Sequence, residues 1–237
     1  MASRNASFHE RGLAGALLAP VKWLALCASI LLGLIVAAWI VDWVMVFQVW
    51  PQGLTRLQDI LRADLLRAAQ LGSMDGEAPA FAVSVANGLY AVLFKLSGVH
   101  DMGSRFAEGA ALSIPDTIAR NAYLDNFEAI QVAMLATQVF GVRLALLLRV
   151  LPLFALAYCV ALADGLTQRA IRRASGGRES ASLYHRAKHL QVVLCALIGA
   201  IILLVPMSID PRWIALPGCV VLALLGRMQW AYYKKHV

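Results

Sequence analysis

Four long apolar runs dominate the pattern of hydrophobic and polar positions along the chain. They occupy residues 23–47, 141–163, 189–209 and 213–230. A helix needs about 20 mostly apolar residues to cross the hydrocarbon core of a bilayer, and each run is close to that length. The pattern therefore predicts an all-α integral membrane protein with four transmembrane helices.

The first two of these runs each belong to a longer pattern. A basic N-terminus, residues 1–22, precedes the first run, as in a signal sequence. The run exceeds the ~7–15 apolar residues of a cleaved signal, so we predict a retained signal-anchor helix. The second run completes a stretch that no proline or glycine interrupts before Gly141, which predicts one long helix over 129–163 whose membrane part is about 141–163.

The segment between the first two spans, residues 48–128, is the most water-compatible part of the chain. Residues 54–71 place leucines and alanine at helical spacing, with arginines and Asp59 on the other side, which is typical of an amphipathic helix. Residues 80–99 are apolar and resemble a further span. We interpret them as a helix of the outer region, and a re-entrant or interfacial segment is the alternative.

The distribution of charge selects four spans and an orientation. Residues 164–188 hold six basic and two acidic side chains, whereas residues 48–128 hold six basic and nine acidic ones. Cytoplasmic loops carry an excess of lysine and arginine. A fifth span at 80–99 would put the basic loop outside. Four spans instead place the N-terminus, the 164–188 loop and the tail 231–237 in the cytoplasm, and residues 48–128 in the periplasm.

Two arginines, Arg143 and Arg149, lie in the second apolar run, where an unpaired charge costs at least ~2.5–3.5 kcal/mol near the bilayer centre. Asp42 is the only acid within the first span and lies near its outer end. We predict that Asp42 pairs with Arg143 or Arg149 and joins the two helices. The alternative is that both arginines extend to the headgroups and Asp42 is interfacial. One acid and two permanently charged arginines make a poor proton relay.

Small residues four apart recur on the spans, a spacing that lets helix backbones approach in lipid. This helix-packing set comprises Gly33, Ala37, Ala155, Cys159, Ala163, Ala196 and Ala200. It indicates a compact bundle, docking against partner helices, or contacts between copies of the chain.

Composition and motifs exclude several classes of function. The chain is 60% hydrophobic and 15% charged, far from the roughly 25% charged of soluble domains. It has no GxxxxGK[ST] loop, GxSxG or HExxH motif, so we expect neither an enzyme nor a cofactor. His185 and His189 have the spacing of a metal pair, but Arg186 and Lys188 beside them would repel a cation, so we expect no metal site.

The basic segment 164–188 is the clearest candidate for binding. Its basic residues are Arg169, Arg172, Arg173, Arg178, Arg186 and Lys188. Each such residue near an anionic leaflet contributes about 1 kcal/mol, so anionic phospholipid is the simplest partner. An acidic patch on a cytoplasmic protein is the second candidate, and contact with DNA is the third, because the segment has one aromatic residue, Tyr184.

Several stretches together resemble the integrating conjugative element membrane protein family. They are Gly88–Tyr123, Gly177–Gln191, the sequence DPRW and the terminal AYYKKHV. The resemblance implies a multi-pass protein of the bacterial inner membrane that takes part in conjugative DNA transfer through a type IV secretion-like apparatus, alongside a coupling-protein ATPase. It assigns no catalytic residue.

We therefore expect a non-enzymatic scaffold subunit that contacts other membrane subunits of the transfer apparatus and docks the coupling ATPase or a channel subunit. A regulatory protein of a mobile element, such as an exclusion or immunity factor, is the alternative. A small transporter fits poorly, because the spans lack the interrupted helix pairs and polar midplane residues of a transport site.

Overall fold

The computed structural model describes residues 2–71, 78–107, 114–176 and 181–233, and every regular element among them is a helix. In chain order the elements are α1 (Ala2–Val44), η1 (Met45–Val49), α2 (Leu54–Leu71), α3 (Ala78–Tyr90), η2 (Ala91–Lys95), α4 (Val99–Ala107), α5 (Ile114–Asp125), α6 (Phe127–Ala174), α7 (Ala181–Leu204) and α8 (Pro211–Ala231). Here η1 and η2 are single π-helical turns that end α1 and α3.

The chain divides into two compact units, Met1–Ala37 and Ala38–Val237. The first contains only the N-terminal part of α1. The second contains the end of α1 and all other helices, and it holds every contact described below.

Four helices within the described residues are long and apolar enough to cross a membrane, as the hydrophobic pattern predicted. They are Pro20–Val49, Phe127–Ala174, Ser182–Leu204 and Pro211–Ala231. Large apolar side chains on their outer surfaces are exposed, including Leu156, Val160 and Val220. Contiguous exposed apolar surface of this kind is unfavourable in water and is expected where helices face lipid. The all-α class and the four span-length helices are thus confirmed.

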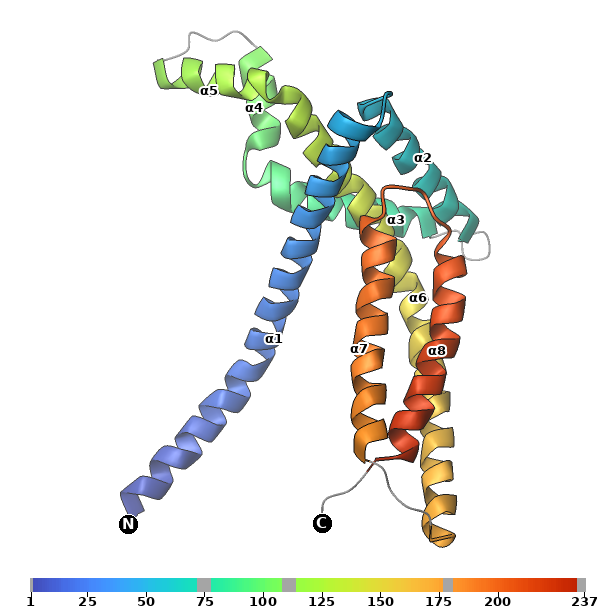
Figure 1. Cartoon of the computed structure of the whole chain (residues 1–237). Helices are drawn as coiled ribbons and strands as arrows, with labels where there is room; N and C mark the ends of the chain where they lie inside the picture. Colours follow the sequence, from blue (N-terminus) through green and yellow to red (C-terminus); the bar gives the residue numbers. More distant parts are fainter. Residues whose placement is uncertain (1, 72–77, 108–113, 177–180, 234–237) are drawn as a thin grey trace. The chain divides into compact units, whose positions relative to one another are not determined.

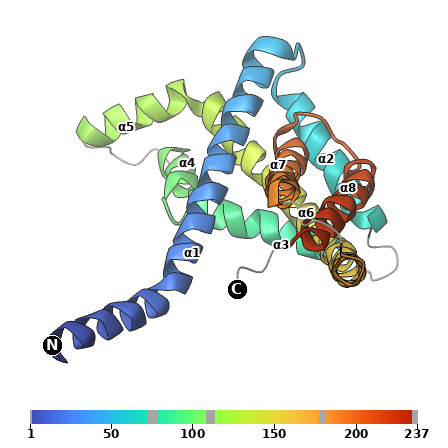
Figure 2. The ribbon, with the colours of Figure 1, turned by 60° about the horizontal axis from the view of Figure 1, so that its bottom comes forward.

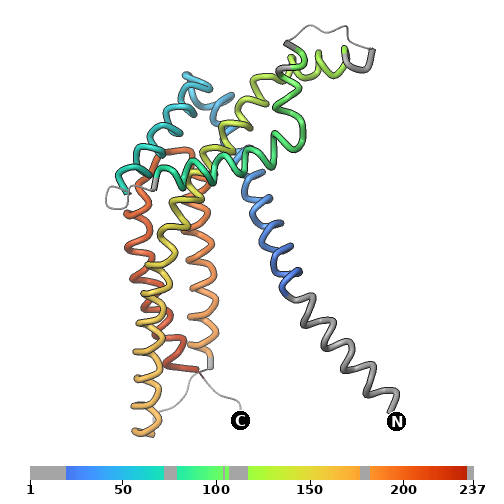
Figure 3. Tube along the Cα trace, turned by 180° about the vertical axis from the view of Figure 1, so that it is seen from behind, coloured from blue at the N-terminus to red at the C-terminus, as the bar shows by residue number. Residues whose placement is uncertain are grey.

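The second half of α6 packs beside α7 and α8 (Figures 1 and 3; Figure 2 views the three helices more nearly along their axes). Glycines allow this close approach. A Cβ atom on Gly165 would lie 2.8 Å from the backbone oxygen of Arg227, and one on Gly226 would lie 3.2 Å from the Tyr158 ring. An exposed ion pair between Asp164 and Arg227 adds a further link between α6 and α8.

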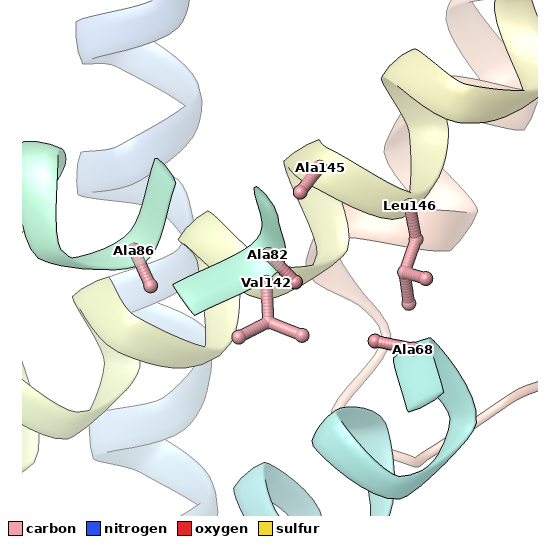
Figure 4. Close-up of a cluster of buried hydrophobic side chains, with 6 residues drawn as sticks. All are labelled: Ala68, Ala82, Ala86, Val142, Ala145 and Leu146. Carbon is pink, nitrogen blue, oxygen red and sulfur yellow. The ribbon is translucent and has the colours of Figure 1, made fainter. Parts of the chain in front are cut away.

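Helix α3 instead runs across α6 (Figure 1). Its apolar part, Pro79–Lys95, is shorter than a span. Small side chains make the crossing close: Ala82 and Ala86 of α3 belong to one buried cluster with Val142 and Ala145 of α6 and with Ala68 of α2 (Figure 4). The apolar segment is therefore helical over 78–95, as α3 and η2, with a turn before α4, and α3 packs against α6. Its place in the outer region stays a prediction.

Aromatic side chains join the remaining outer helices to α6. The Trp39 indole donates a hydrogen bond to the Thr137 hydroxyl at 2.9 Å, and its ring lies 5.9 Å from that of Phe94. Tyr90 contacts Phe94, and its hydroxyl lies 2.8 Å from Nδ1 of His100. Burial, followed by the nearby Tyr123, raises the pKa of Tyr90, so this hydroxyl stays protonated at neutral pH. These contacts hold the end of α1, η2 and α4 near the first half of α6.

Candidate functional site

A buried ion pair joins α2 to α6. Arg143 of α6 is 5% exposed and Asp64 of α2 is 2% exposed. The Arg143 Nε donates to Asp64 Oδ2 at 2.8 Å. The two terminal nitrogens of the same guanidinium donate to backbone carbonyls, Nη1 to Val205 at 2.6 Å and Nη2 to Met207 at 2.9 Å. One side chain therefore contacts α2 and the α7–α8 connection at once.

Two further side chains complete the coordination of the Asp64 carboxylate. The Ser208 hydroxyl donates to Asp64 Oδ1. Arg67, one turn along α2, places Nη1 3.5 Å from the same oxygen and also donates to Ser208. We refer to Asp64, Arg67, Arg143 and Ser208 as the charge cluster.

The charge cluster satisfies the conditions under which a buried ion pair is tolerated. Removing charges from water costs several kcal/mol per ion, and the pair is stable only when the remaining donors and acceptors are also bonded. Here each oxygen of the Asp64 carboxylate accepts a hydrogen bond, and Arg143 donates from all three of its nitrogens. The Val205 carbonyl lies at the end of α7, where carbonyls lack helical donors and the helix dipole favours a cation.

The charge cluster lies where three parts of the fold meet. The connection between α7 and α8 joins two helices that are long and apolar enough to cross a membrane. Arg143 is bonded to that connection through the Val205 and Met207 carbonyls. Asp64 then holds α2 against it, so the charge cluster fixes the water-compatible helices to the span-length helices at one point.

The structure differs from the prediction on the partner of Arg143. Asp42 is buried, at 6% exposed, but no ion pair joins it to Arg143 or Arg149 in the described part of the chain. Arg143 pairs with Asp64 instead, because that carboxylate lies on the buried side of α2. Arg149 lies over the ring of Phe81 of α3, with its guanidinium carbon 5.9 Å from the ring centroid.

The sequence carries a signal for the burial of Asp64 in the pattern of α2. The buried residues of α2 are Leu57, Ile60, Asp64 and Ala68, which follow one another at three- and four-residue spacing. An acid on the apolar stripe of an amphipathic helix requires a cationic partner, because an isolated buried carboxylate is strongly unfavourable. Arg143 was the matching cation.

The predicted basic segment divides into packed and exposed residues. Arg172 stacks on Tyr232 with its guanidinium carbon 3.8 Å from the ring centroid, and Arg169 lies 5.2 Å from that of Tyr233. Two nitrogens of Arg169, Nε and Nη2, are buried and have no hydrogen-bond partner among the described residues. Arg173, Arg186 and Lys188 are exposed. Arg178 lies outside the described residues.

Aromatic rings from α7, α8 and the residues after α8 surround the two packed arginines. Tyr184 and Trp230 lie 5.6 Å and 5.7 Å from the Tyr233 ring, and the Trp230 indole donates to the Tyr158 hydroxyl at 3.0 Å. These contacts pack the rings and the two arginines together beside the exposed basic side chains. We refer to Arg169, Arg172, Tyr184, Trp230, Tyr232 and Tyr233 as the arginine–aromatic end.

Most of the small residues predicted to pack helices are exposed in the described structure. Ala155, Cys159 and Ala163 are exposed on α6, and Ala196 is exposed on α7. Gly33 and Ala37 belong to the separate N-terminal unit, and Ala200 is partly exposed. The close contacts use Gly141, Gly165 and Gly226 instead. Docking of partner helices on the exposed set stays a prediction.

Comparison with known proteins assigns most of the chain. A family model described as IncC plasmid conjugative DNA transfer protein DtrJ-like matches residues 49–234. The match begins in the last residue of η1 and includes the charge cluster and the arginine–aromatic end. No curated protein matches the chain, and no solved structure does.

Proposed function

This chain belongs to the DtrJ-like family of conjugative DNA transfer proteins, and from that premise we propose that it is a non-enzymatic scaffold subunit of the transfer apparatus in the bacterial inner membrane. The apparatus is type IV secretion-like, and the mobile element is an integrating conjugative element, as the sequence resemblance implies. The observation that carries the scaffold role is the charge cluster, which fixes a set of water-compatible helices to span-length helices.

The proposed orientation follows the charge distribution. The N-terminus and the C-terminal tail lie in the cytoplasm together with the basic segment 164–188, and α2 to α5 lie on the periplasmic face. Basic residues outnumber acidic ones in 164–188, whereas acidic residues outnumber basic ones in 48–128, and this difference supports the arrangement. The scaffold thereby presents one surface to the periplasmic and membrane parts of the channel and another to cytoplasmic partners.

The cytoplasmic surface would dock the coupling ATPase or a channel subunit through the exposed basic residues beside the arginine–aromatic end. Rigid aromatic packing around Arg169 and Arg172 supports this, because a preorganised surface loses less conformational entropy on binding. Anionic phospholipid would engage the same charges when no protein partner is bound.

Deletion in one mating partner at a time tests the scaffold role. A scaffold is required in the donor, so deletion of its gene there abolishes transfer. Expression of a second copy in the donor restores transfer, and the presence of the protein in the recipient has no effect. An exclusion or immunity factor shows the opposite pattern: donor deletion leaves transfer intact, and the protein in the recipient blocks it. That second result would contradict the scaffold role.

Charge removal at the cytoplasmic surface tests the docking. Arg186→Gln combined with Lys188→Gln removes two exposed charges at the start of α7. At about 1 kcal/mol per charge, we expect roughly tenfold or greater loss of co-purifying ATPase in a detergent pull-down and a matching fall in transfer frequency. Arg56→Gln with Arg105→Gln, two exposed arginines on α2 and α4, is the matched control and should change neither quantity. Equal loss in both double variants would exclude a specific docking surface.

A further inference from the structure

A cavity of about 840 Å³ lies between α3, the end of α2 and the middle of α6. Its lining includes Phe81 and Ser84 of α3 and Leu146, Leu148, Arg149 and Pro152 of α6. The lining combines a permanent cation and a hydroxyl with apolar side chains. A molecule that fills the cavity must therefore carry both an anionic group and an apolar part.

Arg149 supplies the polar part of the cavity. Its guanidinium lies over the Phe81 ring, and no carboxylate of the described residues lies within 4.0 Å of it. A guanidinium in a span-length helix requires a counter-charge or access to the headgroups. Ser84 adds a second hydrogen-bond donor on the facing helix. Together they favour an anion with several acceptor oxygens, which is the chemistry of a phosphate.

Pro152 creates an acceptor in the same place. Proline has no backbone N–H, so Pro152 inside α6 leaves the carbonyl of Leu148 without its helical donor. Leu148 and Pro152 both line the cavity. In a membrane this carbonyl requires another donor. A ligand with both a phosphate and a donor group would satisfy Arg149 and the carbonyl together.

The depth of Arg149 matches that of a lipid headgroup and the start of its acyl chains. Arg143 donates to the Val205 carbonyl at the end of α7, and Arg149 follows Arg143 by six residues, which places it about 9 Å further along α6 at ~1.5 Å per residue. Because the end of a span-length helix is expected near the edge of the hydrocarbon layer, we expect Arg149 beside the start of the acyl chains. An arginine at that depth can extend toward the headgroups. In the lining, Phe81 and Leu148 are exposed and apolar, as acyl chains require.

We propose that this cavity binds one phospholipid whose headgroup carries a hydrogen-bond donor, such as phosphatidylethanolamine. The phosphate accepts hydrogen bonds from Arg149 and Ser84, the headgroup donor bonds to the Leu148 carbonyl, and the acyl chains cover the apolar lining. The bound lipid fills the space between α3 and α6. This proposal is independent of the scaffold role, because it concerns the chain and its bilayer alone.

Native mass spectrometry of the full-length protein, released from detergent after exchange with phosphatidylethanolamine, tests the site. Wild-type protein should retain one lipid, and Arg149→Met should lower the retained fraction roughly tenfold, the effect of losing charge-assisted hydrogen bonds. Arg212→Met, which removes an exposed arginine at the start of α8, is the control and should retain lipid as the wild type does. Phosphatidylcholine, which has no headgroup donor, should be retained less than phosphatidylethanolamine. Equal retention by Arg149→Met and wild type would overturn the proposal.

Photo-crosslinking in a protein that keeps Arg149 identifies the occupant directly. A benzophenone amino acid at Leu148, on the exposed part of the lining, should give an adduct with the mass of a phospholipid. An adduct to a peptide of this chain, to a second copy or to another protein would overturn the proposal, and so would retention of inorganic phosphate alone. Because this second test keeps Arg149, it remains decisive even where Arg149→Met destabilises the fold.

Discussion

Replacing Asp64 with alanine lowers the free energy of unfolding by about 3–5 kcal/mol, because the change leaves the buried Arg143 guanidinium without its carboxylate. The Ser208 hydroxyl and Arg67 lose their common acceptor at the same time. We expect α2 to detach from α6 and the yield of folded protein to fall. Titration of the purified protein in micelles with a denaturing detergent measures the loss.

Two comparisons separate the charge cluster from general effects of mutation. Asp59→Ala removes the acid of an exposed pair on the same helix, in which the side chains of Arg62 and Asp59 are 75% and 61% exposed, and should cost at most ~1 kcal/mol. Asp64→Leu combined with Arg143→Met removes both charges and should recover most of the stability, since paired removal leaves no unpaired ion. If the double variant is no more stable than Asp64→Ala, the pairing is not what makes Asp64 necessary.

Gly141→Ala is the second substitution with a large expected effect. A Cβ atom at this position would lie 2.5 Å from the Cα atom of Ala86 and 3.1 Å from its nitrogen, so α3 must move away from α6. Overpacking of this kind costs roughly 1–3 kcal/mol, more than the helix propensity that alanine gains over glycine. The same detergent titration measures the loss, and hydrogen exchange should show faster opening of α3.

Gly88→Ala provides the matched control, because a Cβ atom there meets nothing within 4 Å. Gly88 lies in α3 and Gly141 in α6, so both changes add a methyl group within a helix and differ mainly in the presence of a close neighbour. We expect Gly88→Ala to be neutral or slightly stabilising. Comparable losses in both variants would show that the crossing at Gly141 does not determine how α3 is held.

Hydrophobic periodicity is sufficient to predict the helices but not to predict which helices contact one another. The span-length helices are long continuous apolar runs, and the helix at 54–71 has apolar residues at three- and four-residue spacing. Both patterns identify the helices from the residues alone. The same pattern does not say which faces meet. Asp42 was chosen as the partner of the arginines because it was an acid within a span, whereas the fold brings Asp64 to Arg143 from 79 positions away.

The role of a glycine is ambiguous in the sequence for a related reason, because it can mark a helix boundary or a close approach of two helices. In the sequence, Gly141 marks the end of an uninterrupted helical stretch, whereas in the fold it is the point of closest approach between α3 and α6. Gly165 and Gly226 likewise form the contact of α6 with α8, while the small residues chosen from their four-residue spacing are mostly exposed. Spacing identifies a face on which backbones can approach, and only tertiary structure selects the faces that do.

The most direct test of the account is the side of the membrane on which α2 lies. In a variant without its four cysteines, one cysteine is placed either at Ala69, exposed on α2, or at Ala174, exposed at the end of α6. A maleimide that cannot cross the inner membrane is then added to spheroplasts. The account predicts rapid labelling of Ala69→Cys, and labelling of Ala174→Cys only after the cells are lysed. Labelling of Ala174→Cys in intact spheroplasts, with Ala69→Cys protected, would contradict it.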